Sequence, residues 1–175
     1  QSRLFKIFGT RWLMLLLVLF TSLPAVAIEA YANYTSGNTT LTFYYDNLRS
    51  SRSGKTYALN TGSTDPAWSS INPSVTQVVF DASFAGARPT TTKGWFFKMA
   101  NLQSITDINY LNTSSATSMQ SMFNGCSSLE SVDLSGCNTA NVTNMYGLFY
   151  GCTNLATVNF SGLNTPHVPD MRELF

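Results

Sequence analysis

The chain has 175 residues, only 11% of them charged, and its formal net charge is +1. So small a charge gives no field that would draw in nucleic acid or an anionic membrane, and composition therefore excludes both as expected partners. Its three cysteines are an odd number and cannot form a closed disulfide framework.

Residues 1–27 have the pattern of a secretory signal peptide. Basic side chains precede an unbroken apolar run at 12–20, and Pro24 separates that run from Ala25-Val26-Ala27. The apolar run is much shorter than the about 20 residues that a membrane-spanning helix requires. We expect residues 1–27 to be removed on export, so that the protein is secreted or lies at the cell surface. Contact with the membrane is expected only through this segment or through a missing anchor.

Residues 28–94 show no internal repeat and predict a β-rich N-terminal cap. β-branched and aromatic residues are concentrated at 40–45, 55–59 and 75–80, where we expect strands, and 46–54 is expected to hold a turn. We expect this region to cover one end of the hydrophobic core formed by the residues that follow.

Residues 95–175 carry a sequence repeat of constant length. The same interval separates the members of each of these sets: Phe97, Phe123, Phe149 and Phe175; Leu111, Cys137 and Leu163; Asn112, Asn138 and Asn164; Met119, Met145 and Met171. About three units are present, and we expect the chain to be a piece of a longer protein, truncated within the array. The first unit is imperfect, because Leu102 comes one residue early relative to Leu129.

Each unit predicts one short strand followed by one helical turn. In Val132-Asp-Leu134 apolar side chains flank a polar one, which indicates a strand whose middle residue faces outward. Met145, Leu148 and Phe149 have the spacing of one helical face, and Gly151 can end that turn in a left-handed conformation. A unit of this size cannot bury its apolar edge alone and must stack on its neighbours.

The spacing of Leu129, Val132 and Leu134 is that of a leucine-rich repeat, and the length of the unit lies within the range of such repeats. The predicted fold is therefore an α+β or β-rich solenoid of the leucine-rich-repeat type. Its 26-residue coils would stack behind the N-terminal cap.

The repeats resemble those of the BspA-like leucine-rich repeat surface proteins of bacteria. The resemblance is carried by Met122-Phe-Asn-Gly-Cys-Ser-Ser-Leu129, by 132–135 and by 138–145, and the stretches 78–89 and 94–96 resemble the segment that leads into such repeats. It extends over about residues 29–175. It implies an exported cell-surface protein, and some members of the family are adhesins for host matrix proteins or for other microbes.

The chain departs from the BspA-like pattern at three positions. Cys137 stands where an aromatic residue is usual, and Pro166 and Pro169 stiffen the third unit.

The outward-facing strand positions form the predicted binding face. Its residues are Asp107, Glu130, Ser131, Asp133 and Asn159. Solenoids bind partners along such faces because every unit presents a side chain in line. For any one of these residues, ordinary solvated surface is the alternative.

Two further sets are predicted to be structural. The asparagines of the repeat are expected to form a ladder whose side chains satisfy backbone groups in the turn after the strand: Asn112, Asn138 and Asn164. Cys126 and Cys152 occupy equivalent positions in adjacent units, with Ala100 expected there in the first unit. They either line the core or form a bridge in an oxidising compartment.

Four aromatic residues in and beside the cap, Tyr44, Tyr45, Trp68 and Trp95, allow stacking on a sugar but are more typical of core packing. No catalytic, cofactor or metal site is predicted. His167 is the only histidine, and no nucleophile motif or phosphate-binding glycine loop is present.

We therefore expect a protein without enzymatic activity or cofactors. It would bind an extracellular protein or glycan, on host matrix or on other microbes, as an adhesin does. A structural spacer that presents a downstream domain is the alternative.

Overall fold

The computed structural model describes residues 26–169 and 171–175, so that residues 1–25 of the predicted signal peptide lie outside the described residues. The described chain is β-rich, with two small sheets of strand order β3-β1-β2-β4-β5 and β6-β7. The strands are β1 (Glu29–Thr35), β2 (Thr40–Asp46), β3 (Lys55–Ala58), β4 (Gln77–Phe80), β5 (Ser104–Thr106), β6 (Ser131–Asp133) and β7 (Thr157–Asn159). Short 3-10 helices are formed by Arg49–Ser51, Ser69–Ser74, Ala82–Gly86 and Ile108–Tyr110. None of the helices in these residues is long and apolar enough to cross a bilayer.

The N-terminal region is built on β1, which pairs antiparallel with β2 on one side and β3 on the other. Strands β2, β3 and β4 lie where strands were predicted, at 40–45, 55–59 and 75–80. Strand β1 was not predicted, and its two alanines are residues that favour strands only weakly.

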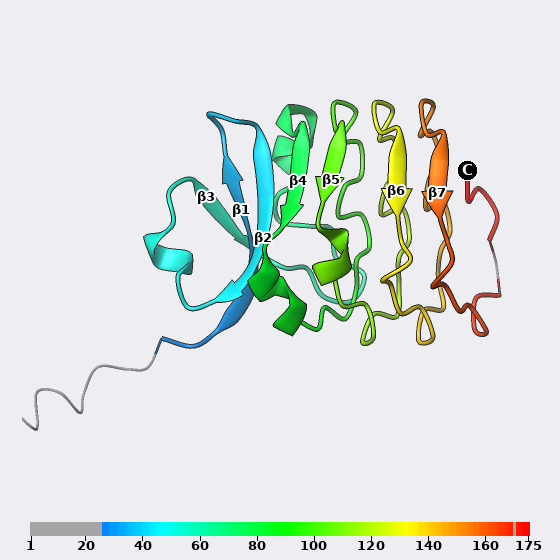
Figure 1. Ribbon diagram of the computed structural model, residues 1–175, viewed down its shortest axis with the longest axis horizontal. Helices are drawn as coiled ribbons and strands as arrows, with labels where there is room; N and C mark the ends of the chain where they lie inside the picture. The colour runs from blue at the N-terminus through cyan, green and yellow to red at the C-terminus, as the bar shows by residue number, and fades with distance from the viewer. Residues whose placement is uncertain (1–25, 170) are drawn as a thin grey trace, which may run out of the picture.

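The first sheet continues from this region into the repeats. β4 pairs in parallel with β2 and with β5, and Gln77 lies opposite both Thr40 and Ser104. Figure 1 shows β4, β5, β6 and β7 upright and side by side along the molecule. Parallel stacking therefore begins at β4, upstream of residue 95, where the predicted repeats start.

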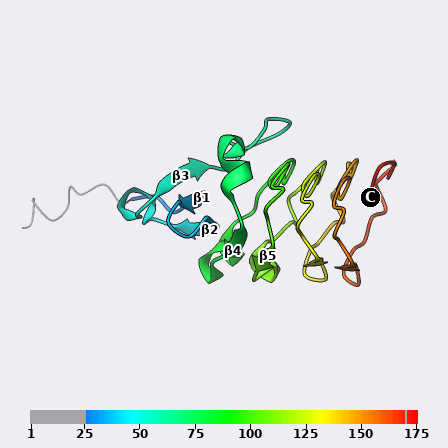
Figure 2. The ribbon, with the colours of Figure 1, turned by 90° about the horizontal axis from the view of Figure 1, so that it is seen from above.

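Successive units are joined by main-chain hydrogen bonds. The N–H of Phe123 donates to Leu148 O at 2.9 Å, and that of Phe149 donates to Leu174 O at 2.7 Å. β6 and β7 pair in parallel, with Val132 opposite Val158. Figure 2 shows the units from above as a row of similar loops.

The first unit differs in register from the sequence prediction. Phe96, which is fully buried, takes the position of Phe123, whereas Phe97 is 36% exposed. Phe96 N–H donates to Met122 O and Phe123 N–H donates to Leu148 O, so the first step along the chain is one residue longer than the next. The extra residue is absorbed at the end of β5, where Asp107 adopts a left-handed φ of 57°.

The predicted helical turn is instead a series of tight turns. Leu148 N–H donates to Met145 O, and Cys152 N–H donates to Phe149 O. Gly147, inside the first of these turns, has a φ of +63°, and its equivalent in the preceding unit, Ser121, has a φ of +53°. A right-handed helix needs negative φ throughout, so it cannot continue through these residues. The described residues contain no α-helix, which makes the fold β-rich rather than α+β.

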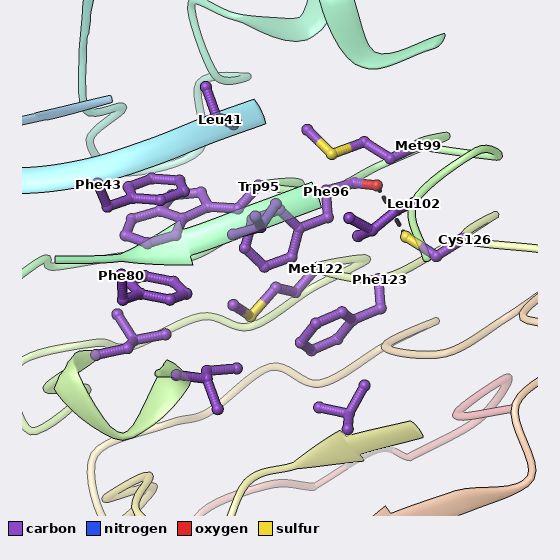
Figure 3. Close-up of a cluster of buried hydrophobic side chains, with 14 of the residues drawn as sticks. Leu41, Phe43, Phe80, Trp95, Phe96, Met99, Leu102, Met122, Phe123 and Cys126 are labelled. Atoms are coloured by element: carbon purple, nitrogen blue, oxygen red, sulfur yellow. Dashed lines mark hydrogen bonds between the residues drawn. The ribbon is translucent and has the colours of Figure 1, made fainter. Parts of the chain in front are cut away.

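Aromatic rings run through the core along the stack. Phe43 stacks on Phe80 and on Trp95, with ring centroids 4.8 and 4.9 Å away. The three side chains are grouped together in the close-up of Figure 3. In the repeats, Phe123 and Phe149 stack at 5.1 Å. The repeated phenylalanines therefore contact one another from unit to unit, which explains their regular spacing.

Candidate binding surfaces

The predicted binding face is exposed at all five of its residues: Asp107, Glu130, Ser131, Asp133 and Asn159. Pairing of β6 with β7 places Ser131 opposite Thr157 and Asp133 opposite Asn159. Side chains of paired residues lie on the same face of a sheet, so these four form two short rows. Thr157 was missed, although it holds the same position in its unit as Ser131.

Asp107 does not belong to these rows. The third residue of each of β5, β6 and β7 is Thr106, Asp133 and Asn159 in turn. Asp107 is the inserted residue of the first unit and follows the strand in a left-handed conformation. The predicted register is therefore wrong by one residue at Asp107, as it is at Phe97, because the first unit contains one extra residue.

Asp133 and Asn159 are engaged in the turns that follow their strands. Asp133 Oδ1 accepts a hydrogen bond from Ser135 N–H at 2.9 Å, and Asn159 Oδ1 accepts one from Ser161 N–H at 3.1 Å. Hydrogen bonds from Ser135, and a weaker one from Asn159, lower the pKa of Asp133. These two side chains stabilise turns, which leaves Glu130, Ser131 and Thr157 as the side chains best able to meet a partner.

The asparagines of the repeat cap turns in two units. Asn112 Oδ1 accepts from Ser114 N–H at 3.0 Å, and Asn138 Oδ1 accepts from Ala140 N–H at 3.1 Å. Asn164 cannot repeat this bond, because the residue two positions on is Pro166, which has no N–H.

Beside these asparagines, threonine side chains form the hydrogen bonds between neighbouring units. The buried hydroxyl of Thr113 donates to Asn138 O at 2.8 Å, and that of Thr139 donates to Asn164 O at 2.7 Å. No role was predicted for these threonines, although they recur at the repeat interval.

Cys126 and Cys152 are free thiols in neighbouring units. Cys126 Sγ donates to Phe96 O at 3.1 Å, the dashed contact in Figure 3, and Cys152 Sγ donates to Phe123 O at 3.0 Å. Contact with the Cys152 thiol, together with burial, raises the pKa of Cys126, and contact with Cys126 lowers the pKa of Cys152. Met99, rather than Ala100, fills the equivalent position in the first unit, because its N–H donates to Phe96 O.

Of the four aromatic residues considered for sugar stacking, Trp68 and Trp95 are fully buried. The guanidinium carbon of Arg52 lies 3.3 Å from the ring centroid of Tyr44. A Cβ added at Gly86 would come within 2.7 Å of the Tyr45 ring, so that ring packs directly on the main chain. The two tryptophans therefore belong to the core, and the two tyrosines already have partners on their rings.

A cleft of about 480 Å³ was not predicted from the sequence. It lies between the segment 65–73 and the turns of the first units. The polar and aromatic residues lining it include Asp65, Ser69, Asn72, Lys93, Phe97 and Lys98. The incorrect register aligned Phe97 with the repeated phenylalanines, so its exposure beside the cleft was not predicted.

Among residues 26–169 and 171–175, no three His, Cys, Asp or Glu side chains gather where they could hold a metal ion. A family model described as "Mycoplasma protein of unknown function, DUF285" matches residues 86–175, about half of the chain. The match includes β5, β6 and β7 and begins at the last residue of the 3-10 helix Ala82–Gly86, which follows β4. Neither the curated proteins nor the solved structures provide a significant match.

Proposed function

The chain belongs to the DUF285 family of Mycoplasma-type bacterial proteins, and we propose that it is an exported surface protein whose repeats bind an extracellular protein or glycan. Its units would form a solenoid of the leucine-rich-repeat type, similar to that of the BspA-like surface proteins. The function would be adhesin-like, without catalysis or a cofactor.

The solenoid proposal is supported by the way in which the units contact each other. Parallel pairs join β4 to β5 and β6 to β7, and in each pair the second strand follows the first by about one unit of the chain. After the first unit, the donors and acceptors in the turns of neighbouring units are offset by one constant step, as between Phe123 and Leu148 or Phe149 and Leu174. Contacts of this kind between successive units are what joins the units of repeat proteins generally.

The exposed rows on β6 and β7 are the observation that carries the binding proposal. Ser131 and Thr157 lie opposite each other, both exposed, and Glu130 precedes them with an exposed carboxylate. A partner that spans two units would contact equivalent residues of both units, which lie side by side on the sheet. Rows of this kind are how solenoids form extended binding surfaces.

Export is supported by the position of the first strand. β1 begins at Glu29, two residues after the predicted cleavage site at Ala27. Removal of residues 1–27 would therefore leave the five-stranded sheet complete. We propose that the mature protein acts outside the cell or at its surface.

A structural spacer is the second candidate, and one observation favours it. Asp133 and Asn159 use their side-chain oxygens to hold turns, so part of the strand face serves the fold rather than a ligand. In that case the units would only present a domain that lies elsewhere in a longer protein.

Binding to an array of host matrix proteins and glycans tests the adhesin proposal. Ser131→Lys with Thr157→Lys places two ammonium groups on the strand face and leaves the turn-holding Asp133 and Asn159 intact. The charge-matched control is Ser36→Lys with Ser115→Lys, at two exposed positions in turns. Saturable binding that only the strand-face variant loses would support an adhesive face there. If the wild-type chain binds nothing on the array, the spacer becomes the better proposal.

A further inference from the structure

We propose that the cleft between segment 65–73 and the first units binds a carboxylate-bearing sugar residue of the hexuronate class. This cleft is separate from the strand face, and its occupation does not require the adhesin proposal to hold. Its volume of about 480 Å³ lies within the range of small-ligand pockets.

One wall of the cleft is apolar and partly aromatic. The register of the first unit buries Phe96 and turns Phe97 outward, with 36% of its surface exposed. Pro66 and Pro73 contribute further apolar surface from the opposite segment. An exposed ring beside proline surface suits the flat C–H face of a pyranose, which is apolar although the sugar edge is polar.

Two lysines line the cleft, and within the described residues only one of them, Lys93, has a carboxylate partner. Lys93 Nζ is held by Asp65 Oδ1 at 3.1 Å and by Ser63 O at 2.6 Å. Lys98 Nζ lies 5.1 Å from the Phe97 ring centroid, and in the described part of the chain no ion pair includes it. A carboxylate on a sugar packed against Phe97 would be close enough to pair with Lys98.

Lys98 occupies a position that favours glycine. Its φ is +58°, and the equivalent residues of the next units are Gly125 and Gly151, at +77° and +73°. A lysine there gives up the easier left-handed conformation of glycine. The lysine side chain lines the cleft, which is consistent with its ammonium group binding a ligand there.

Two further polar residues, Asp65 and Asn72, line the cleft. Asn72 is 3% exposed, and its Nδ2 donates to Phe97 O at 2.5 Å. Its Oδ1 has no donor among the described residues, which is costly for a buried amide. The Asp65 side chain is 78% exposed and keeps an oxygen available beyond its contact with Lys93. A hydroxyl group of a polyol can donate to this Asp65 oxygen, whereas Asn72 Oδ1 is buried from solvent.

An acidic peptide fits the cleft less well. An extended peptide needs main-chain partners along its length, as at a free sheet edge. Here the walls are the 3-10 helix Ser69–Ser74 and tight turns, and two of their carbonyls are already used. Pro73 O accepts from Asn101 Nδ2, and Phe97 O accepts from Asn72 Nδ2. A compact sugar needs only local contacts, and the observations therefore favour it.

Calorimetric titration of the whole chain with D-glucuronate tests the proposal, with D-glucose as the ligand that lacks the carboxylate. We expect glucuronate to bind at least about 10-fold more tightly than glucose, and added salt to weaken it, because the ion pair is exposed. Lys98→Gln should remove this preference, and Phe97→Ala should weaken both sugars. Lys55→Gln is the matched control, since Lys55 Nζ lies at a similar 5.2 Å from the Tyr57 ring away from the cleft.

Equal affinity for both sugars, no saturation by glucuronate, or glucuronate binding unchanged by Lys98→Gln would overturn the proposal. So would a glutamate-rich peptide that binds with a dependence on Lys98 while glucuronate does not. The strand-face variant should retain glucuronate binding. That result separates the two proposals, because either surface can fail without the other.

Discussion

The indole N–H of Trp68 donates to the main-chain oxygen of Trp95 at 2.7 Å, and both side chains are fully buried. Trp95 in turn donates its indole N–H to Asn60 Oδ1 at 2.7 Å. The two tryptophans thereby join the segment after β3, the segment before β4 and the first unit. The N-terminal region and the repeats consequently share one core, consistent with the sheet that runs through both.

Trp68→Phe should lower the free energy of unfolding by about 2 kcal/mol, because it leaves the buried Trp95 carbonyl without its donor and removes part of a packed ring. Urea denaturation followed by circular dichroism measures the loss. Tyr150→Phe, at a residue that is 50% exposed, is the control and should change stability by less than about 0.5 kcal/mol. Similar losses in both variants would contradict the role given to the indole.

Thr139→Val should cost about 1–2 kcal/mol, since it removes the buried hydroxyl that donates to Asn164 O and leaves that carbonyl unpaired. Thr153→Val, at an exposed residue, provides the control for the same change of side chain. The measurement is again chemical denaturation. A neutral Thr139→Val would mean that the main-chain bonds alone hold the second and third units together.

The repeat interval predicted the stacking of the units because the same apolar positions must face the core in every unit. Three of the four strands in the N-terminal region were predicted for a similar reason, from runs of β-branched and aromatic residues. The alternation of apolar and polar residues predicted that Val132 and Leu134 are buried on either side of an exposed Asp133.

The register of the first unit could not be predicted, because Phe96 and Phe97 are adjacent phenylalanines and only packing decides which is buried. The predicted helical turn failed for a different reason. A left-handed residue at Ser121 has no clear signal in the sequence, since serine rarely adopts that conformation. The cleft was missed because Asp65 and Asn72 lie far along the chain from Lys98.

The cluster of Tyr31, Asp46 and Arg52 predicts how stability depends on pH. Burial opposes ionisation of Asp46, but hydrogen bonds from Tyr31, from Leu48 N–H and from Arg52 outweigh it and lower the pKa. Burial, followed by the hydrogen bond to Asp46, raises the pKa of Tyr31 to about 12. Because folding lowers the pKa of Asp46, its carboxylate stabilises the folded protein above the ordinary pKa of 3.8, and this stabilisation is lost as the pH falls. Because folding raises the pKa of Tyr31, its phenol stabilises the folded protein below the ordinary pKa of 10.0, and this stabilisation is lost as the pH rises towards 12.

The free energy of unfolding should therefore decline below pH 4 and above pH 10, as far as this cluster is concerned. Asp46→Asn should flatten the acid decline, and Tyr31→Phe the alkaline one. Asp65→Asn is the control, because its carboxylate is 78% exposed. A pH profile that Asp46→Asn leaves unchanged would show that other carboxylates cause the acid decline.

Cys152 should be the first thiol to react with a disulfide reagent. Its pKa is lowered and it is partly exposed, whereas burial raises the pKa of Cys137 to about 11 and the pKa of Cys126 is raised as well. Titration of the folded protein near pH 8 should label one thiol quickly, and Cys152→Ser should abolish that phase. Loss of two hydrogens by mass spectrometry, without labelling, would instead reveal a bridge between Cys126 and Cys152.

The last described unit should make the isolated chain self-associate. Phe160, Met171 and Phe175 are 36, 42 and 66% exposed, although their equivalents in the preceding units are buried. Exposed apolar side chains at the end of a stack gain free energy when they are covered.

Sedimentation velocity over a range of concentrations measures this association. Met171→Lys with Phe175→Glu should weaken it by about tenfold or more, which corresponds to losing about 1.4 kcal/mol of apolar burial. Leu48→Lys, at a residue that is 49% exposed on the N-terminal region, should not weaken it. A monomer at every concentration, with a sharp melt that does not depend on concentration, would show that the last unit is stable without a partner. In that case the stacking of Phe149 on Phe175 at 5.6 Å would be enough to close the core at that end.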